Sequence, residues 1–492
     1  MALRIREARH GGGLTWLGAL VMIVSACATP APATTPAPTL RLTRCQVAKS
    51  TAEARCGTLE VFEDRAAKTG RVIPINILVL PALTERPAPD PIFVLAGGPG
   101  FGAASAVDGN VVDFFRPMRR QRDVVFVDQR GTGESHRLSC PQAAGVGAST
   151  PFGEMLPADR IRACREALEK TADLRLYTTS IAMDDVDDVR AALGYSTINL
   201  YGVSYGSLAA MEYLRRHPRR VRSLALGGVA TPAQKLPLQF AAGAQAALDH
   251  LLADCAADEP CRGAFPDLAA DLATVLTRFD AGPVTFDLPR ATGETAEHVS
   301  LSQALFAEHL RLMLYSLRSA SRVPLILHRT AAGDWGPFAR AASPRRALPP
   351  TFALGMYLSV TCSESIAVIT EEEIVQAARG SFVGEDRTRV HVRACREWPR
   401  GAVPAAFYEP VASAVPALLL SGELDAATPA HYATTLARGL PNARQVLIRN
   451  AAHEYFADCL RDLVAEFFAQ GSARDLDTRC VETLRRPPFV TR

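Results

Sequence analysis

Three residues far apart in the chain have the types and the order that nucleophilic catalysis needs. Ser204 is the middle residue of Gly202–Gly206, which fits the pattern G-x-S-x-G, and Asp425 and His453 follow it in that order. A serine hydroxyl is a weak nucleophile until a base removes its proton. We therefore predict that His453 acts as general base and then as general acid, and that Asp425 fixes the tautomer of His453.

The residues on either side of Ser204 make this pattern informative. Thr197–Tyr201 is apolar and β-branched, which predicts a strand, and Ser207–Pro218 predicts a helix that ends at proline. A sharp turn from strand to helix holds the serine Oγ away from the surrounding chain. The flanking glycines are needed because Cβ atoms would clash in such a turn.

The predicted acid and base also follow strands. Pro416–Ser421 and Arg444–Arg449 are apolar runs that precede Asp425 and His453. In an open α/β sheet, the loops at the carboxyl ends of parallel strands lie along one edge and bind ligands there. We therefore expect both side chains to meet the serine at this edge. Glu423, which is closer to the end of its strand, remains an alternative for the acid.

A glycine-rich turn, Gly97–Gly100, follows another predicted strand, Pro91–Ala96. Such a turn can direct a backbone N–H group at a developing oxyanion. We predict that Gly98 and Tyr205 donate the two N–H groups of an oxyanion hole. A phosphate-binding loop is excluded here because neither G-x-x-x-x-G-K-[ST] nor G-x-G-x-x-G is present. Asp128–Ser135 is a second strand end turned by glycines, which we interpret as structural support beside the site.

Strands and helices alternate along much of the chain. Further apolar runs predict strands at Arg71–Leu80, Asp123–Asp128 and Val221–Gly227. This alternation predicts the α/β class with a mostly parallel sheet. Residues 232–410 exceed what a connection between two strands requires and contain helical stretches, so we expect an inserted, mainly helical cap. Residues 41–231 and 411–492 would form the two parts of the core.

The N-terminus predicts export. Three arginines precede the short apolar run Leu14–Ala26, as in a secretory signal peptide. This run is shorter than the ~20 apolar residues that span a bilayer. Val24–Cys27 resembles the bacterial lipobox, so residues 1–26 would be removed and Cys27 would carry the lipid anchor. Residues 27–40, rich in Pro, Ala and Thr, would continue as a tether. Ordinary cleavage around Cys27, giving a free secreted protein, is the alternative.

The chain contains 11 cysteines, and setting Cys27 aside leaves an even number. An exported chain meets an oxidising compartment, so disulfides are expected, with free buried thiols as the alternative. The sequence leaves the connectivity open. We expect pairing between neighbours in the sequence: Cys45–Cys56, Cys140–Cys164, Cys255–Cys261, Cys362–Cys395 and Cys459–Cys480.

Composition and motifs exclude several classes of function. The chain is 48% hydrophobic and 21% charged, a composition typical of globular proteins. Its formal net charge of +3 is small and gives no reason to expect a nucleic-acid partner. His453-Glu454 lacks the second histidine of a zinc motif, and no C-x-x-C motif occurs. We therefore expect no metal and no cofactor. The oligomeric state does not follow from the sequence.

Four motifs, together with His453, resemble the α/β-hydrolase peptidases, which include proline iminopeptidases and secreted tripeptidyl aminopeptidases. The motifs are GGPG at 97–100, DQRGTGES at 128–135, GVSYG at 202–206 and LDAATP at 424–429. The resemblance covers about residues 40 to 485. It implies an α/β-hydrolase fold and a serine exopeptidase that acts on short peptides from a free N-terminus.

An enzyme of that kind must recognise an ammonium group, which requires a carboxylate near the site. The resemblance points to an acidic cap residue, and Glu364, beside Cys362, is our candidate for substrate binding. A solvated surface glutamate is the alternative. Glu212, on the helix after the serine, is interpreted as structural. A carboxylesterase or lipase-like hydrolase is the competing activity, and a catalytically silent envelope lipoprotein is a third hypothesis.

Overall fold

The computed structural model describes residues 40–140, 154–288, 296–342 and 351–492. Pro38–Arg492 forms one compact unit. The predicted signal peptide and the anchor Cys27 lie outside the described residues, as does almost all of the tether. In the part of the chain that is described, no helix is both long and apolar enough to cross a membrane.

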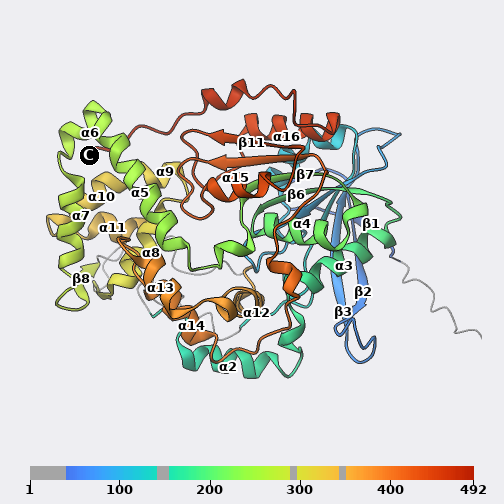
Figure 1. Cartoon of the computed structure of the whole chain (residues 1–492), viewed down its shortest axis with the longest axis horizontal. Helices are drawn as coiled ribbons and strands as arrows, with labels where there is room; N and C mark the ends of the chain where they lie inside the picture. Colours follow the sequence, from blue (N-terminus) through green and yellow to red (C-terminus); the bar gives the residue numbers. More distant parts are fainter. Residues whose placement is uncertain (1–39, 141–153, 289–295, 343–350) are drawn as a thin grey trace, which may run out of the picture. The chain divides into compact units, whose positions relative to one another are not determined.

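Within the described residues, the core is built on a nine-stranded sheet with the order β1-β2-β3-β5-β4-β6-β7-β10-β11 (Figure 1). The strands are β1 (Thr43–Cys45), β2 (Ala54–Phe62), β3 (Val72–Leu80), β4 (Ile92–Leu95), β5 (Val124–Val127), β6 (Ile198–Ser204), β7 (Val221–Val229), β10 (Ala417–Gly422) and β11 (Ala443–Ile448). Neighbours from β5 to β11 pair in parallel. The pairs β1–β2, β2–β3 and β3–β5 are antiparallel. The predicted α/β class with a mostly parallel sheet is confirmed.

Helices cover both faces of this sheet. Alternate residues of β4 point to opposite faces: Phe93 and Leu95 join one hydrophobic cluster, and Ile92 and Val94 join the other. Burial on both faces explains why the central strands read as continuous apolar runs. The first face packs against α2 (Ala158–Leu168), α3 (Thr179–Ala192), α4 (Tyr205–Arg216) and α15 (His431–Ala437). The second packs against α1 (Gly109–Phe115) and α16 (Asp458–Gln470).

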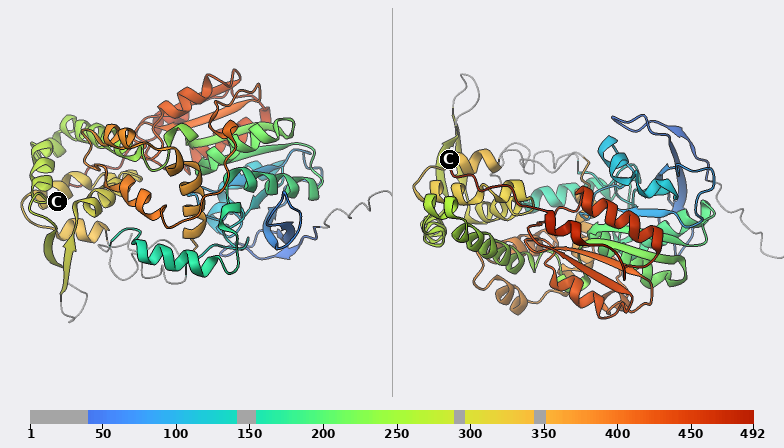
Figure 2. Two further views of the ribbon diagram at one scale, coloured as in Figure 1. Left: turned by 60° about the horizontal axis from the view of Figure 1, so that its bottom comes forward. Right: turned by 90° about the horizontal axis from the view of Figure 1, so that it is seen from above.

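A separate hydrophobic cluster lies in the predicted cap, mostly between Ala241 and Ala342 (Figure 2). Its helices are α5 (Phe240–Ala257), α6 (Glu259–Ala264), α7 (Leu268–Thr277), α8 (Gln303–Met313), α9 (Leu317–Ala320), α10 (Val323–Ala331) and α11 (Gly336–Ala342). A hairpin of β8 (Val284–Leu288) and β9 (Glu297–Leu301) interrupts them, which the sequence analysis did not anticipate.

The later part of the same interval packs differently. It holds α12 (Leu354–Glu364), α13 (Glu371–Ala378) and α14 (Asp386–Ala394). Leu358, Val360 and Trp398 belong to the hydrophobic cluster on the first face of the sheet, not to the cap cluster. Within 232–410, the described residues therefore comprise an outer helical group and a later segment that packs on the core and, through Phe382 and Val383, also on the cap cluster.

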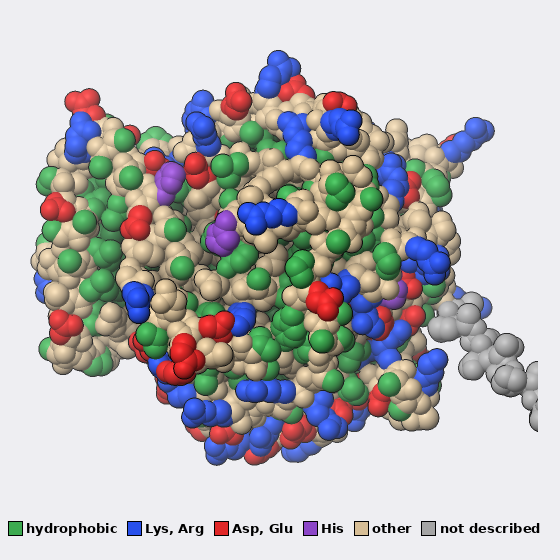
Figure 3. All heavy atoms as spheres, viewed as in Figure 1, with side chains coloured by type: hydrophobic (Ala, Val, Ile, Leu, Met, Phe, Trp, Pro, Cys, Tyr) green, Lys and Arg blue, Asp and Glu red, His purple; other side chains and the backbone are tan. Residues whose placement is uncertain are grey.

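The five expected disulfides are present, and the pairing between sequence neighbours is confirmed: Cys45–Cys56, Cys140–Cys164, Cys255–Cys261, Cys362–Cys395 and Cys459–Cys480. One of them joins α12 to the end of α14. On the face shown in Figure 3, acidic and basic side chains are interspersed.

Candidate active site

The turn at Ser204 has a strained backbone. Ser204 ends β6 with φ 60° and ψ −128°, and α4 starts at the next residue. A positive φ is rare for a residue with a side chain and persists only when its surroundings enforce it. A Cβ atom on Gly202 would lie 2.3 Å from the carbonyl oxygen of Gly206, and one on Gly206 would lie 2.2 Å from that of Leu95. The two glycines are therefore needed for this turn to form.

Asp425 lies in the loop after β10 and is buried, with 3% of its surface exposed. Its Oδ2 is 2.8 Å from His453 Nδ1 and accepts hydrogen bonds from the hydroxyls of Tyr455 (2.7 Å) and Thr428 (2.8 Å). Its Oδ1 accepts the backbone N–H groups of Ala427 and Thr428, each at 2.8 Å. This set of donors holds the carboxylate in one orientation toward the imidazole.

The electrostatics of Asp425 favour its charged form. Burial alone pushes its pKa upward, but the charge and hydrogen bond of His453, with the bonds from Thr428 and Tyr455, outweigh burial and hold the pKa below its usual value. Glu423, the alternative acid, is exposed. The carboxylate at the imidazole is therefore that of Asp425.

His453 lies beside the end of β7. Ser204 is in register with Val229 on that strand. A Cβ atom on the preceding residue, Gly228, would lie 3.1 Å from His453 Cε1. The imidazole is therefore packed against the strand next to the serine. The hydrogen bonds found among the described residues do not include one from the Ser204 hydroxyl to His453. Such contacts are often long in unliganded enzymes and shorten when substrate binds.

The glycine-rich turn after β4 also lies at Ser204. A Cβ atom on Gly97 would be 3.4 Å from Ser204 Cβ and 4.0 Å from its Oγ. Gly98 follows with φ 115°, a backbone conformation that side chains disfavour, and it is exposed. Tyr205 is the first residue of α4, where a backbone N–H group has no acceptor within the helix. The positive end of the α4 dipole also favours negative charge here.

Asp128 organises the neighbouring turn. Its carboxylate accepts hydrogen bonds from Asn76 Nδ2 (2.9 Å), from the backbone N–H and hydroxyl of Ser105 (3.0 and 2.5 Å), and from the N–H of Glu134 (3.0 Å). A Cβ atom on Gly133 would lie 2.0 Å from Asp128 Oδ2. These contacts agree with our interpretation of Asp128–Ser135 as structural support.

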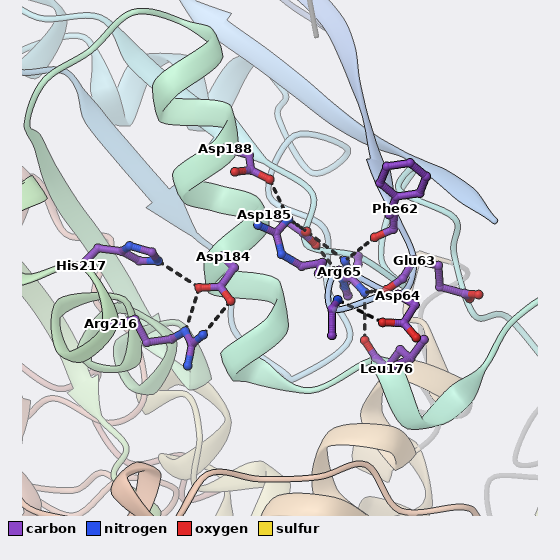
Figure 4. Close-up of polar contacts among 12 residues, drawn as sticks. Phe62, Glu63, Asp64, Arg65, Leu176, Asp184, Asp185, Asp188, Arg216 and His217 are labelled. Carbon is purple, nitrogen blue, oxygen red and sulfur yellow. Dashed lines mark hydrogen bonds and ion pairs between the residues drawn. The ribbon is translucent and has the colours of Figure 1, made fainter. Parts of the chain in front are cut away.

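Arg130 extends that support into the core. It is fully buried, and its guanidinium donates to both carboxylate oxygens of Asp185 on α3, at 2.6 and 2.9 Å. Arg65 also donates to Asp185, and to Asp188 one turn further along α3 (Figure 4). Buried and bidentate pairs of this kind fix the position of α3.

Glu364 ends α12 and is also buried, with 4% of its surface exposed. The expectation that it could be a solvated surface residue is wrong. Its carboxylate accepts the backbone N–H (2.5 Å) and the hydroxyl (2.8 Å) of Thr179, the first residue of α3. The same hydroxyl is 2.7 Å from the Tyr205 hydroxyl. Thr179 therefore links the carboxyl group of Glu364 to the side chain of Tyr205, the residue that follows Ser204.

The surroundings of Glu364 disfavour its charge. Burial and, to a smaller extent, the charge of Glu212 raise its pKa to about 8, against the hydrogen bonds from Thr179. Glu212 itself is buried on α4, where it accepts hydrogen bonds from Ser180 (2.6 Å) and Arg215 (3.2 Å). These contacts agree with the structural interpretation of Glu212.

Sequence reasoning missed the residues that hold the predicted machinery in place. Tyr455 and Thr428 fix Asp425, and Thr179 links Glu364 to Tyr205. Thr428 lies three residues after Asp425, at a spacing that allows a local side-chain bond. No comparable signal in the sequence marks Thr179. Among the described residues, no group of three or more His, Cys, Asp or Glu is arranged to hold a metal ion.

The fold and this arrangement of residues define an α/β hydrolase. The family model described as the alpha/beta hydrolase fold matches residues 90–458, and the chain belongs to that family. The predicted α/β-hydrolase fold is therefore confirmed.

Several curated relatives have names that specify a peptidase. The chain is 27% identical over 236 residues to serine protease Hip1 of Mycobacterium tuberculosis, covering 44% of this chain and 45% of that protein. It is 29% identical over 139 residues to a proline iminopeptidase of Neisseria gonorrhoeae, covering 28% and 32%. The chain thus matches less than half the length of each relative. Among solved structures, proline iminopeptidase of Mycobacterium smegmatis aligns with a TM-score of 0.38 at 17% identity, covering 84% of this chain and 96% of that one.

Proposed function

We propose that this chain is an exported serine hydrolase that releases residues from the free N-terminus of short peptides through an acyl-enzyme on Ser204. The observation that carries the proposal is the hydrogen bond of 2.8 Å between the buried Asp425 and the partly buried His453, beside the strained turn of Ser204. Relatives named serine protease and proline iminopeptidase support peptides as the substrate class.

In the acylation step, Ser204 Oγ attacks the carbonyl carbon of the scissile bond and its proton moves to His453 Nε2. The carbonyl oxygen becomes an oxyanion, which the N–H groups of Tyr205 and Gly98 stabilise. The C–N bond then breaks, His453 returns its proton to the leaving amine, and an ester on Ser204 remains. Water, deprotonated by His453, hydrolyses that ester and restores the serine hydroxyl.

Asp425 serves His453 in both steps. Because its pKa is held low, it stays ionised and accepts the Nδ1–H group, which leaves Nε2 free as the base. It also stabilises the imidazolium that forms during the reaction. The hydrogen bonds from Tyr455 and Thr428 keep this carboxylate from rotating away.

Glu364 is our proposal for the group that recognises the substrate ammonium. Its pKa is raised by burial and by a second carboxylate, and in the described part of the chain no cation is among the groups that shift it. A buried carboxylate without a cation gains free energy when one arrives, because pairing offsets the lost hydration. Thr179 joins Glu364 to Tyr205, so this carboxyl group lies one hydrogen-bonded residue away from the catalytic turn.

The discriminating experiment compares three substrate types on the same preparation. Fluorogenic short peptides with a free N-terminus, the same peptides acetylated, and p-nitrophenyl esters of short acids are assayed with wild type and with Ser204→Ala. The proposal predicts that free peptides react at least about tenfold faster than acetylated ones, and that Ser204→Ala abolishes turnover of all three. Equal rates on free and acetylated peptides would refute the aminopeptidase assignment.

A carboxylesterase or lipase-like activity is the second candidate. Acyl transfer to Ser204 proceeds in the same way for esters and amides, so the Ser–His–Asp chemistry fits both. Turnover confined to the p-nitrophenyl esters would establish this alternative.

Export and lipid attachment complete the proposal. The five disulfides support an oxidising compartment. We propose that Cys27 carries the lipid and that residues 27–40 act as a tether. Cys27→Ser should move the protein from the membrane fraction to the soluble extracellular fraction. An unchanged distribution would reject the anchor.

A further inference from the structure

Two hydrogen bonds join the cap to the loop of His453, one donated by the loop and the other donated by the cap. The N–H of His453 donates to the carbonyl oxygen of Tyr315 at 3.1 Å. The N–H of Leu317 donates to the carboxylate of Glu454 at 3.1 Å. The rings of Tyr315 and His453 are also in contact, with centroids 5.1 Å apart. The turn between α8 and α9 is therefore fastened to the residue proposed as general base and to its neighbour.

Tyr315 is in turn held from within the cap. Arg311, on α8 and buried, donates from Nη1 to the hydroxyl of Tyr315 at 2.5 Å. Its guanidinium carbon lies 5.0 Å from the centroid of the Tyr315 ring and 4.5 Å from that of Phe240. A guanidinium in contact with two rings is held by cation–π attraction as well as by its hydrogen bond. This leaves the side chain of Tyr315 little freedom to turn away from His453.

An ion pair with Glu308 holds Arg311 in place. Glu308, one turn earlier on α8, accepts two hydrogen bonds from Arg311 at 2.8 Å each, and it lies 3.3 Å from Arg387 on α14. Burial raises the pKa of Glu308, but the charges of Arg311 and Arg387 outweigh it and bring that pKa to about 2. Glu308 therefore stays ionised at neutral pH, and its ion pairs with the two arginines persist. Through Arg311 and Tyr315, these ion pairs connect α14 and α8 to the loop of His453.

The position of a general base governs its efficiency. Proton transfer requires hydrogen-bond reach, and displacement by about 1 Å can cost about a hundredfold in rate. Asp425 fixes the side chain of His453 from one direction. Tyr315 contacts the same residue from the cap, at both its backbone and its ring.

We propose that Tyr315 is a positioning residue, which holds His453 toward Ser204 and makes nucleophile activation depend on how the cap is docked. This inference rests on the proposed function. It assigns to the α8–α9 turn a role in the chemical step that is separate from substrate recognition. Displacement of the turn would weaken the base while leaving the Asp425–His453 hydrogen bond in place.

The test measures how fast Ser204 reacts with a fluorophosphonate. In this reaction the serine Oγ displaces fluoride from phosphorus and its proton passes to His453, so the rate reports activation without any peptide specificity. Tyr315→Ala, in the full chain, should lower the second-order rate constant at least about tenfold, and Tyr315→Phe about two- to threefold. In peptide turnover, kcat should fall by similar factors while KM changes less than about twofold.

Tyr195→Phe is the matched control. The Tyr195 hydroxyl donates to Asp123 at 2.7 Å within the core, so its removal costs a comparable hydrogen bond far from the cap turn. This variant should label at the wild-type rate. Glu454→Ala should slow labelling, because Leu317 loses its acceptor, whereas Glu454→Gln keeps a carbonyl oxygen there and should restore most of the rate.

The outcomes separate this inference from the function on which it rests. If wild type does not react with the fluorophosphonate, the serine-hydrolase proposal fails. If wild type reacts and folded Tyr315→Ala reacts equally fast, the positioning role is refuted while the hydrolase proposal stands. If Tyr195→Phe slows labelling as much as Tyr315→Phe, the effect reflects general destabilisation, and the positioning role is likewise refuted.

Discussion

Asp425 and Glu364 are both buried carboxyl groups near Ser204, and each accepts hydrogen bonds from a backbone N–H and a threonine hydroxyl. Their protonation differs because their charged neighbours differ. Asp425 faces His453, and its pKa is lowered. Among the described residues, Glu364 has no imidazole beside it, and burial, with a smaller contribution from the charge of Glu212, raises its pKa to about 8. Burial raises the pKa of both groups, so the difference in sign comes from His453, which lowers the pKa of Asp425 and has no counterpart among the described neighbours of Glu364.

This difference suits two tasks. A carboxylate that stays ionised can orient an imidazole through every step of a reaction. A carboxyl group that is close to its titration point at neutral pH can respond to an arriving cation, which would lower its pKa and fix its charge. Substitutions at the two carboxyl groups should therefore affect different kinetic constants.

Asp425→Asn should reduce kcat by about three to four orders of magnitude. The amide has a similar shape but can donate to Nδ1, which favours the wrong tautomer of His453. Steady-state kinetics on a free peptide and on a p-nitrophenyl ester measure the loss, which should be similar for the two substrates. A loss of less than tenfold would mean that Asp425 does not orient the base.

Glu364→Gln should raise KM for peptides with a free N-terminus by about tenfold, because a buried charge-assisted hydrogen bond contributes about 1.5–3 kcal/mol. Turnover of p-nitrophenyl esters should stay within about twofold of wild type. Glu371→Gln, at an exposed glutamate on α13, is the control. If esters and peptides lose activity equally, Glu364 supports the fold and does not bind the amine.

The raised pKa of Glu364 also predicts how stability depends on pH. The folded state holds this proton up to about pH 8, whereas the unfolded chain releases it near 4.5. The contribution of Glu364 to stability is therefore fully present below about pH 4.5 and is lost as pH rises through about 8. Within this window it falls by at most ~1.4 kcal/mol per pH unit.

Thermal unfolding of wild type and Glu364→Gln between pH 5 and 9 measures this effect. The difference in Tm between them should move in favour of the glutamine variant as pH rises to about 8, and then level off. A constant difference would show that Glu364 is already ionised in the folded protein. The lowered pKa of Asp425 predicts the opposite slope, because its stabilisation is lost only as pH falls through its folded pKa.

Glu423→Gln should have the smallest effect, leaving kcat and KM unchanged within about twofold. Glu423 is exposed, and the carboxylate at His453 is that of Asp425. A large loss of kcat with Glu423→Gln would reopen the assignment of the acid.

The sequence could predict those parts of the site that are built locally. The strand, turn and helix around Ser204 are contiguous, and Asp425 and His453 each follow an apolar strand at the same edge of the sheet. The strands before Ser204 and Asp425 are buried on both faces, so they form continuous apolar runs that can be recognised in the sequence. The cysteine pairs could be predicted for a related reason, since each joins neighbours in the sequence.

The network around Glu364 could not be predicted, because it joins residues that only the tertiary fold brings together. Thr179 and Glu364 are 185 positions apart. The residues of α12 are buried almost all round the helix, so no amphipathic pattern marked which side faces the core. The contact of Tyr315 with His453 is tertiary in the same way, since it depends on how the cap docks.

If Ser204 forms an acyl-enzyme with the help of His453, the intermediate can be trapped. Wild type is mixed with p-nitrophenyl acetate, quenched with acid within the first turnover, digested and mapped by mass spectrometry. We expect a burst of p-nitrophenol and an acetyl group on the peptide that contains Ser204, both absent in Ser204→Ala and strongly reduced in His453→Ala. An acetyl group at another residue, or a burst that persists in Ser204→Ala, would contradict it.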